Sequence, residues 1–233
     1  PKNRRSNPCS SCINPFPSKK SKKKSLGLMD ELKVAHILKN ELGFKDSSIK
    51  KIKKLHNHLL EYNKRYNLIS KKTENSIWFR HILDSAQLIK FIDFSKVKNL
   101  VDFGSGAGFP GLIIGIYAED LSFHVKLYEK SKIKREFLKN MKRNFNLKNV
   151  SIKNNVYEKP ISTDIIVCRA FKKLKEILMI SREIVKKPHK LIVLKGKNAQ
   201  SEINNVSLAS NYSYKLEKSI TDNDSKIIIV EVK

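Results

Sequence analysis

The sequence predicts an α/β protein with a mostly parallel seven-stranded sheet, helices on both faces and a small N-terminal helical region. From residue 99 onward, short apolar segments typical of strands alternate with segments of helical periodicity, as in a parallel sheet whose connections are helices. A glycine-rich turn, residues 102–111, joins the first of these strands to the first helix. With 233 residues and 40% hydrophobic side chains, the chain is long enough for one such domain and an appendage.

Residues 1–28 are predicted to be a disordered basic tail. They contain many basic side chains, no acidic one, and Pro8, Pro15 and Pro17, a composition that cannot bury a core. Three interpretations stay open: a flexible arm that binds nucleic acid, an organelle-targeting presequence, or sequence upstream of the true start. We favour the third, because Met29 opens the first helical pattern.

Residues 29–98 are predicted to form the N-terminal helical region, because apolar side chains recur there at near-helical spacing. We expect a short helix that ends near Gly43, a second between Ser47 and Tyr66, and a third over Ile77–Phe91.

Residues 99–233 are predicted to form the sheet domain. The expected strands are Leu100–Phe103, His124–Glu129, Val150–Lys153, Asp164–Cys168, Lys190–Leu194, Tyr212–Ser219 and Lys226–Val232. The expected helices between them are Gly111–Ala118, Lys132–Phe145, Leu174–Lys187 and Ala199–Asn205. The last two strands flank Asp222-Asn223-Asp224, which predicts a hairpin that adds an antiparallel strand to the sheet.

Composition narrows the class of partner. The 48 Lys and Arg residues against 22 Asp and Glu give a net charge of +26, which favours nucleic acid because each neutralised phosphate releases counterions. The alternative explanation of the high Lys content is AT-biased coding, which enriches a chain in Lys, Ile and Asn. No apolar run is long enough for a membrane helix. Cys9, Cys12 and Cys168 form no disulfide framework, and the isolated Cys9–Cys12 pair lacks the further ligands of a zinc site, so we expect no metal.

The turn Asp102-Phe-Gly104-Ser-Gly106-Ala-Gly108-Phe-Pro-Gly111 is the most informative segment. Its glycines permit positive φ and a close approach of ligand to backbone, and the next helix begins with free N–H groups. The spacing also matches the G-x-G-x-x-G pattern of dinucleotide sites. Asp102, however, would repel a pyrophosphate and attract the cationic sulfonium and ammonium groups of S-adenosylmethionine. We therefore favour S-adenosylmethionine over NAD, bound by Asp102, Gly104, Gly106 and Gly108.

Glu129 ends the second strand, where an acid can accept hydrogen bonds from both hydroxyls of a ribose. NAD sites use the same arrangement, so Glu129 indicates a nucleoside without distinguishing the two cofactors. A solvated acid at the start of the next helix is the alternative.

Several further segments follow one another in a fixed order. They are Asn67-Leu68, Arg80-His81-Ile82-Leu83-Asp84-Ser85, the 102–111 turn, Lys134-Arg135-x-Phe137-Leu138, Arg169-Ala170-Phe171 and Leu194-Lys195-Gly196. Together they resemble the RsmG family, also called glucose-inhibited division protein B, over about residues 67–196. The resemblance implies a Rossmann-like class I S-adenosylmethionine-dependent methyltransferase that modifies N7 of one guanine, guanine 527, in 16S ribosomal RNA.

The resemblance also implies cofactor contacts, which fall on Gly104, Phe109, Val156, Tyr157 and Arg169. The chain departs from the family pattern at some of these places. Ala107 and Phe109 replace the more usual Pro and Leu, and Glu129 stands where Asp is common. Tyr157 stands where an acid is usual, and Glu158 is the alternative position for that acid.

The implied reaction needs no general base, because guanine N7 has a lone pair and no proton to lose. Catalysis would then consist mainly of in-line positioning, and we name no catalytic residue. Candidates for orienting the guanine or a phosphate are Arg80, His81, Arg169 and Lys195. For His81 we favour a structural link between the helical region and the sheet, and for Asp84 a buried hydrogen-bond partner.

The expected partner is 16S ribosomal RNA or the small ribosomal subunit, held by a basic rim rather than by a standard RNA-binding module. The rim residues would be Lys71, Lys72, Arg80, Lys130, Lys132, Lys134, Arg135, Lys172, Lys173 and Lys197. We expect a cytoplasmic monomer. Two alternatives stay open: a non-catalytic RNA-binding or ribosome-assembly protein and, less favoured, an NAD-binding oxidoreductase.

Overall fold

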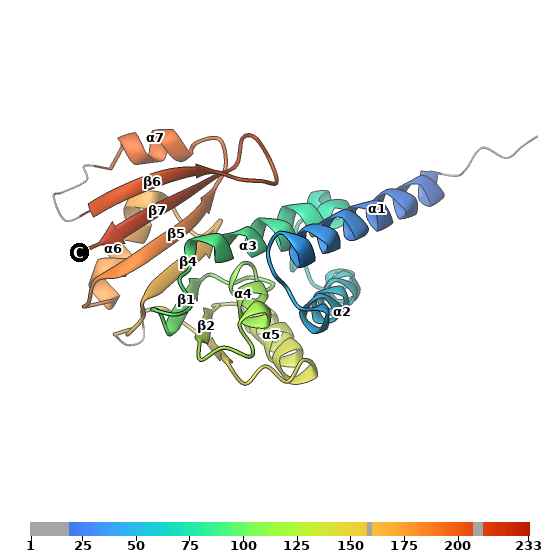
Figure 1. Ribbon diagram of the computed structural model, residues 1–233, viewed down its shortest axis with the longest axis horizontal. Helices are drawn as coiled ribbons and strands as arrows, with labels where there is room; N and C mark the ends of the chain where they lie inside the picture. Colours follow the sequence, from blue (N-terminus) through green and yellow to red (C-terminus); the bar gives the residue numbers. More distant parts are fainter. Residues whose placement is uncertain (1–18, 158–159, 207–211) are drawn as a thin grey trace, which may run out of the picture.

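The computed structural model describes residues 19–157, 160–206 and 212–233 (Figure 1). Its centre is a seven-stranded sheet of order β3-β2-β1-β4-β5-β7-β6, in which every neighbouring pair is parallel except the two that involve β7. The strands are β1 (Asn99–Phe103), β2 (His124–Tyr128), β3 (Val150–Lys153), β4 (Ile165–Arg169), β5 (His189–Lys195), β6 (Tyr212–Lys218) and β7 (Lys226–Val232). The predicted fold class is confirmed, and each strand lies within one residue of its expected ends.

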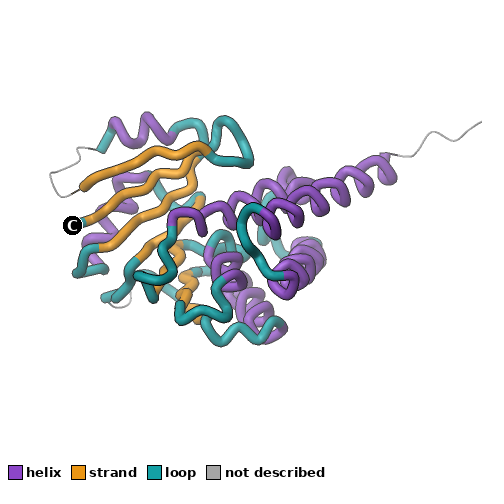
Figure 2. Tube along the Cα trace, in the orientation of Figure 1, coloured by secondary structure: helices purple, strands orange, loops and turns teal. Residues whose placement is uncertain are grey.

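Helices surround this sheet and extend from one end of it. They are α1 (Lys19–Asn40), α2 (Asp46–Asn63), α4 (Gly111–Tyr117), α5 (Lys132–Asn144), α6 (Leu174–Ile184) and α7 (Ala199–Asn204). Between α2 and β1 lies a helical stretch of changing pitch: the 3-10 helices η1 (Lys71–Ser76) and η3 (Gln87–Phe91), the π-helix η2 (Trp78–Leu83) and the short α3 (Asp84–Ala86). Figure 2 shows α1 and α2 at one end of the molecule and the β6–β7 hairpin at the other.

The buried side chains form two apolar clusters, one on each face of the sheet. Successive side chains of a strand point to opposite faces, so Leu100 belongs to one cluster and Val101 to the other. The first cluster contains side chains of α1, α2, η2, α4 and α5, and the second those of α6 and α7. The N-terminal helices and one face of the sheet, from β3 to β7, therefore share one continuous core.

The first helix is longer than expected. Because α1 begins at Lys19, the prediction of disorder is wrong for residues 19–28. The last proline of the tail is Pro17, and the Lys- and Leu-rich sequence after it suits a helix. Residues 1–18, with Cys9 and Cys12, lie outside the described part of the chain.

Helices α2 and α6 each end three residues earlier than expected, for a reason that the structure shows. The buried Asn63 ends α2, because its side-chain Oδ1 accepts the backbone N–H groups of Leu68 and Ile69 at 2.8 and 2.9 Å, so the predicted extension to Tyr66 is wrong. Helix α6 ends at Ile184 rather than at Lys187, since the next residue is already extended and Pro188 disfavours helix at the residue before it.

The third helix has the expected extent but not the expected regularity. Residues 78–83 form a π-helix, which is rare and frequently found at functional sites. Arg80 and His81 lie in this π-helix, and Asp84 follows it directly.

Candidate functional site

The glycine-rich turn lies at the carboxyl end of β1, and the strand order of the sheet reverses between β1 and its neighbour β4. Ligands of open α/β sheets bind at this topological position. Gly104 and Gly106 have φ of 72° and 58°. A Cβ on Gly104 would lie 2.7 Å from Cδ2 of Phe171, whereas nothing lies closer than 3.9 Å to a Cβ on Gly106. The turn is therefore close-packed at Gly104 and open at Gly106.

Asp102 is fully buried beneath this turn. Its Oδ2 accepts the N–H of Gly111 at 2.9 Å, so the carboxylate anchors the start of α4, while Oδ1 is buried without a hydrogen-bond partner among the described residues. Burial raises the pKa of Asp102 to about 7, against the opposing effect of the Gly111 N–H. The sequence predicts a contact of this carboxylate with the cationic groups of the cofactor, whereas the structure places it beneath the backbone of the turn.

Glu129 follows β2 and holds the other side of the turn. Its Oε2 accepts the N–H of Gly106 at 2.8 Å, and its Oε1 accepts the N–H of Ser131 at 2.7 Å at the start of α5. A carboxylate has about four lone-pair positions, so two remain for further donors such as ribose hydroxyls.

The two residues expected on the adenine side differ in exposure. Val156 is buried in the cluster that contains Val101 and Phe103, whereas Tyr157 is 43% exposed. The ammonium of Lys130 lies 5.5 Å from the centre of the Tyr157 ring. Glu158, the alternative position for an acid, lies outside the described residues.

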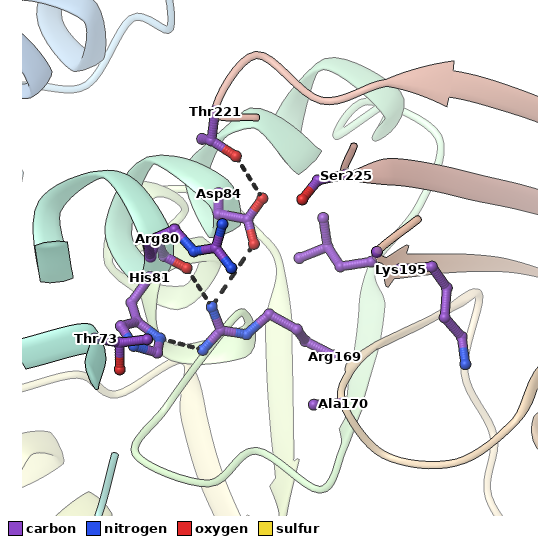
Figure 3. A pocket seen from close by; sticks show the side chains of 11 residues that line it. Thr73, Arg80, His81, Asp84, Arg169, Ala170, Lys195, Thr221 and Ser225 are labelled. Carbon is purple, nitrogen blue, oxygen red and sulfur yellow. Dashed lines mark hydrogen bonds and ion pairs between the residues drawn. The ribbon is translucent and has the colours of Figure 1, made fainter. Parts of the chain in front are cut away.

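A cavity of about 340 Å³ lies at the carboxyl ends of β4 and β5 (Figure 3). The π-helix segment and the β6–β7 loop contribute its other walls. Its lining residues are Thr73, Arg80, His81, Asp84, Arg169, Ala170, Leu194, Lys195, Gly196, Thr221 and Ser225. The cavity thus brings together all four residues that the sequence suggested for substrate positioning.

Arg169, the last residue of β4, is the centre of the polar contacts in this cavity. Its Nη1 donates to the carbonyl oxygen of Arg80 at 2.6 Å and lies 3.7 Å from Oδ2 of Asp84. Its Nη2 lies 2.5 Å from Nδ1 of His81, and its guanidinium lies 5.3 Å from the centre of the Phe109 ring. Figure 3 shows Arg169 reaching from the sheet toward His81 and Asp84. Because Phe109 belongs to the glycine turn, the turn and the cavity are adjacent.

His81 is a neutral link between the helical segment and the sheet. Burial, followed by the nearby guanidinium groups of Arg169 and Arg80, lowers the pKa of His81 to about 3. Since Arg169 donates to Nδ1, the ring proton belongs on Nε2. The structural role predicted for His81 agrees with this geometry.

Asp84 is buried and bonded to the β6–β7 loop. Its Oδ1 accepts from Thr221 at 3.0 Å and from Gln87 at 3.0 Å, and Gln87 also donates to Ser219 at 2.9 Å. Burial raises the pKa of Asp84, and the charge of Arg169 opposes that shift. No local sequence pattern indicates the role of this loop beyond a hairpin turn, because its partners lie more than 130 positions away in the chain.

The remaining two candidates for positioning the substrate, Lys195 and Arg80, each form an ion pair with an acidic side chain. The ammonium of Lys195 lies 2.8 Å from Oε2 of Glu202 and donates to the carbonyl oxygen of Lys172 at 2.6 Å. In Figure 3 this ammonium points away from Arg169 and its neighbours. Arg80 donates from Nη1 to Oδ2 of Asp222 at 2.6 Å.

Two kinds of feature are absent from the described part of the chain. It holds no group of three or more His, Cys, Asp and Glu side chains that could bind a metal ion. It also contains no helix long and apolar enough to cross a membrane.

Comparisons with known proteins identify the family of the chain. The family described as rRNA small subunit methyltransferase G matches residues 48–227. The ribosomal RNA small subunit methyltransferase G of Pelagibacter ubique is 35% identical over 178 residues, which cover 74% of this chain and 83% of the relative. That of Rickettsia felis is 39% identical over 171 residues, or 73% and 86% of the two chains.

The fold alone is also shared with more distant proteins. A crystal structure of a SAM-dependent methyltransferase from Aquifex aeolicus superposes with a TM-score of 0.51 at 13% identity, covering 64% of this chain and 89% of that one. The family match spans most of the chain and includes both the glycine turn and the cavity, which confirms the resemblance seen in the sequence. The chain belongs to the rRNA small subunit methyltransferase G family.

Proposed function

We propose that this protein binds S-adenosylmethionine at the glycine turn and methylates N7 of one guanine of 16S ribosomal RNA, the family-typical guanine 527. The observation that carries the proposal is the adjacency of the two halves of the site. Phe109 of the turn packs against Arg169 and His81 of the cavity. A methyl donor in the turn and a base in the cavity would therefore be neighbours.

The cofactor would be held by Asp102, Gly104, Gly106, Gly108, Phe109, Glu129, Val156, Tyr157 and Arg169. Three features fit this assignment: the open approach to Gly106, the lone pairs that remain on Glu129, and Oδ1 of Asp102, which has no hydrogen-bond partner within the described ranges. When bound, S-adenosylmethionine would supply an electrophilic methyl group on a positively charged sulfur. The glycine turn would hold that methyl group in place at the end of β1.

The protonation states in the cavity suit a nucleophile that has no proton to give up. His81 has a pKa of about 3 and uses Nδ1 to accept from Arg169, so it is poorly placed to act as a base. Asp84 is occupied by Arg169 and by hydroxyl and amide donors. Neither of these two side chains is a free base, and guanine N7 needs none, because its lone pair attacks directly.

The RNA would be held by the basic residues around the carboxyl ends of the strands. The charge of +26 supports this, since phosphate contacts dominate affinity for RNA. We further propose that the protein acts as a cytoplasmic monomer. Membership in the family favours methyl transfer over the two alternatives, a non-catalytic RNA-binding protein and an NAD-linked oxidoreductase.

Calorimetry with S-adenosylmethionine and with NADH tests the cofactor. We expect binding of the first and none of the second. Transfer of a labelled methyl group to 30S subunits or naked 16S RNA tests the reaction, and strand cleavage after borohydride–aniline treatment locates 7-methylguanine. A protein that binds NADH, or that transfers no methyl group to either RNA substrate, would contradict the proposal.

A further inference from the structure

Arg80 and Asp222 form an ion pair beside the cavity. Nη1 of Arg80 lies 2.6 Å from Oδ2 of Asp222, which joins the π-helix to the β6–β7 loop. The side chains of Arg80 and Asp222 are 50% and 32% exposed, so the pair is solvated and easily exchanged. Arg80 lines the cavity and Asp222 does not.

The loop presents the Asp222 carboxylate in a fixed orientation. Its Oδ1 accepts the N–H of Asp224 at 2.9 Å, and its backbone oxygen accepts the N–H of Ser225 at 3.1 Å. One carboxylate oxygen is thus held by the turn and the other is directed at Arg80. The Asp222 carboxylate is therefore an anion of the protein itself that is bound to the Arg80 guanidinium.

The other cations of the cavity wall have acid partners on the inside of the fold. Arg169 lies near the buried Asp84, and Lys195 is paired with Glu202, with side-chain exposures of 12% and 22%. Arg80 is the cation of this wall whose partner is a part-exposed loop residue. It can change partners without leaving a buried charge unpaired.

We propose that Arg80 is the phosphate-binding residue for the nucleotide that enters the cavity, and that Asp222 occupies its guanidinium until RNA displaces it. The guanidinium fork matches a phosphate better than a lysine would, and phosphate oxygens compete well with a single carboxylate oxygen. This inference rests on the proposed function for the choice of a guanine nucleotide. The inference adds to that function a residue, Arg80, that recognises the RNA backbone, and a contact with Asp222 that holds Arg80 before RNA binds.

Binding of guanosine 5′-monophosphate and of guanosine to the intact protein tests the subsite directly, because the two differ by the phosphate. We expect the wild type to prefer the monophosphate and Arg80→Gln to lose that preference. Asp222→Asn keeps the turn but removes the competing charge, so it should strengthen monophosphate binding about two- to fivefold and leave guanosine unchanged. Asp224→Asn, which removes an equal charge from the same turn, is the control and should match the wild type.

Methyl transfer to 30S subunits gives a second readout. Asp222→Asn should lower KM with kcat unchanged, and the gain should vanish when Arg80→Gln is combined with it. The inference is overturned by a wild type without preference for the monophosphate, by a preference that survives Arg80→Gln, or by equal effects of Asp222→Asn and Asp224→Asn. A protein that binds the monophosphate as described but transfers no methyl group would instead contradict the proposed function and leave the subsite standing.

Discussion

Nη2 of Arg169 lies 2.5 Å from Nδ1 of His81, and this bond joins the end of β4 to the π-helix that precedes the sheet. The same guanidinium contacts Asp84 and the ring of Phe109. One side chain therefore connects the helical region, the glycine turn and the cavity wall. Its position depends on His81 remaining a neutral acceptor.

Replacement of His81 should reduce methyl transfer through the position of Arg169. We expect His81→Ala to lower kcat/KM for 30S subunits about tenfold, because a buried guanidinium N–H loses its acceptor. His81→Asn, whose carbonyl oxygen can accept in place of Nδ1, should retain most of the activity.

The pH dependence of kcat/KM distinguishes this role from acid–base catalysis. With a pKa of about 3, His81 does not titrate between pH 6 and 8, so it should contribute no inflection to the wild-type profile there. An inflection near pH 6.5 that disappears in His81→Asn would show that the ring does exchange protons during the reaction.

Asp102 should make the stability of the fold depend on pH in a defined direction. Its pKa is raised from 3.8 in the unfolded chain to about 7 in the fold, so the folded state holds more protons between these values. The contribution of Asp102 to stability is therefore greatest below pH 3.8, falls as the pH rises to 7, and is constant above that. The full difference corresponds to at most about 4 kcal/mol.

Urea unfolding of Asp102→Asn and wild type checks this trend. The amide oxygen can still accept the Gly111 N–H, so the variant should keep the anchor of α4 without the buried charge. Its free energy of unfolding relative to wild type should rise from pH 4.5 to 7 and then level off. A difference that stays constant over this range would mean that the carboxylate ionises in the fold as it does in water.

The sequence predicted the strands well because their signals are local. Alternation, apolar runs and turn residues placed each strand within one residue, and the glycine turn was identified from its own spacing. The end of α2 was predicted wrongly, because it depends on an Asn63 side chain that bonds to backbone groups further along the chain. The orientation of Lys195 and the partners of Asp84 also depend on distant segments, which a local pattern does not reveal.

Gly104 should tolerate a side chain only if Phe171 is shortened. Gly104→Ala places a Cβ 2.7 Å from the Phe171 ring and also imposes a side chain at φ 72°. We expect it to weaken S-adenosylmethionine binding more than tenfold and to lower the melting temperature. Adding Phe171→Ala should restore the part of the binding affinity that was lost to the collision. The backbone strain, about 1 kcal/mol, should remain. Equal affinities of the single and double variants would mean that the ring moves aside at no cost.

Lys195 should prove important for stability rather than for recognition of RNA. Its ammonium is largely buried between Glu202 and the carbonyl oxygen of Lys172, so Lys195→Met should lower the free energy of unfolding by roughly 1–3 kcal/mol. Lys172→Met is the control: this lysine precedes α6 and forms an exposed pair with Glu176 four residues later, and its loss should cost less than about 0.5 kcal/mol. Under conditions where Lys195→Met is folded, its KM for 30S subunits should stay within about threefold of wild type. A stable Lys195→Met variant with a KM raised more than tenfold would instead place this ammonium on the RNA.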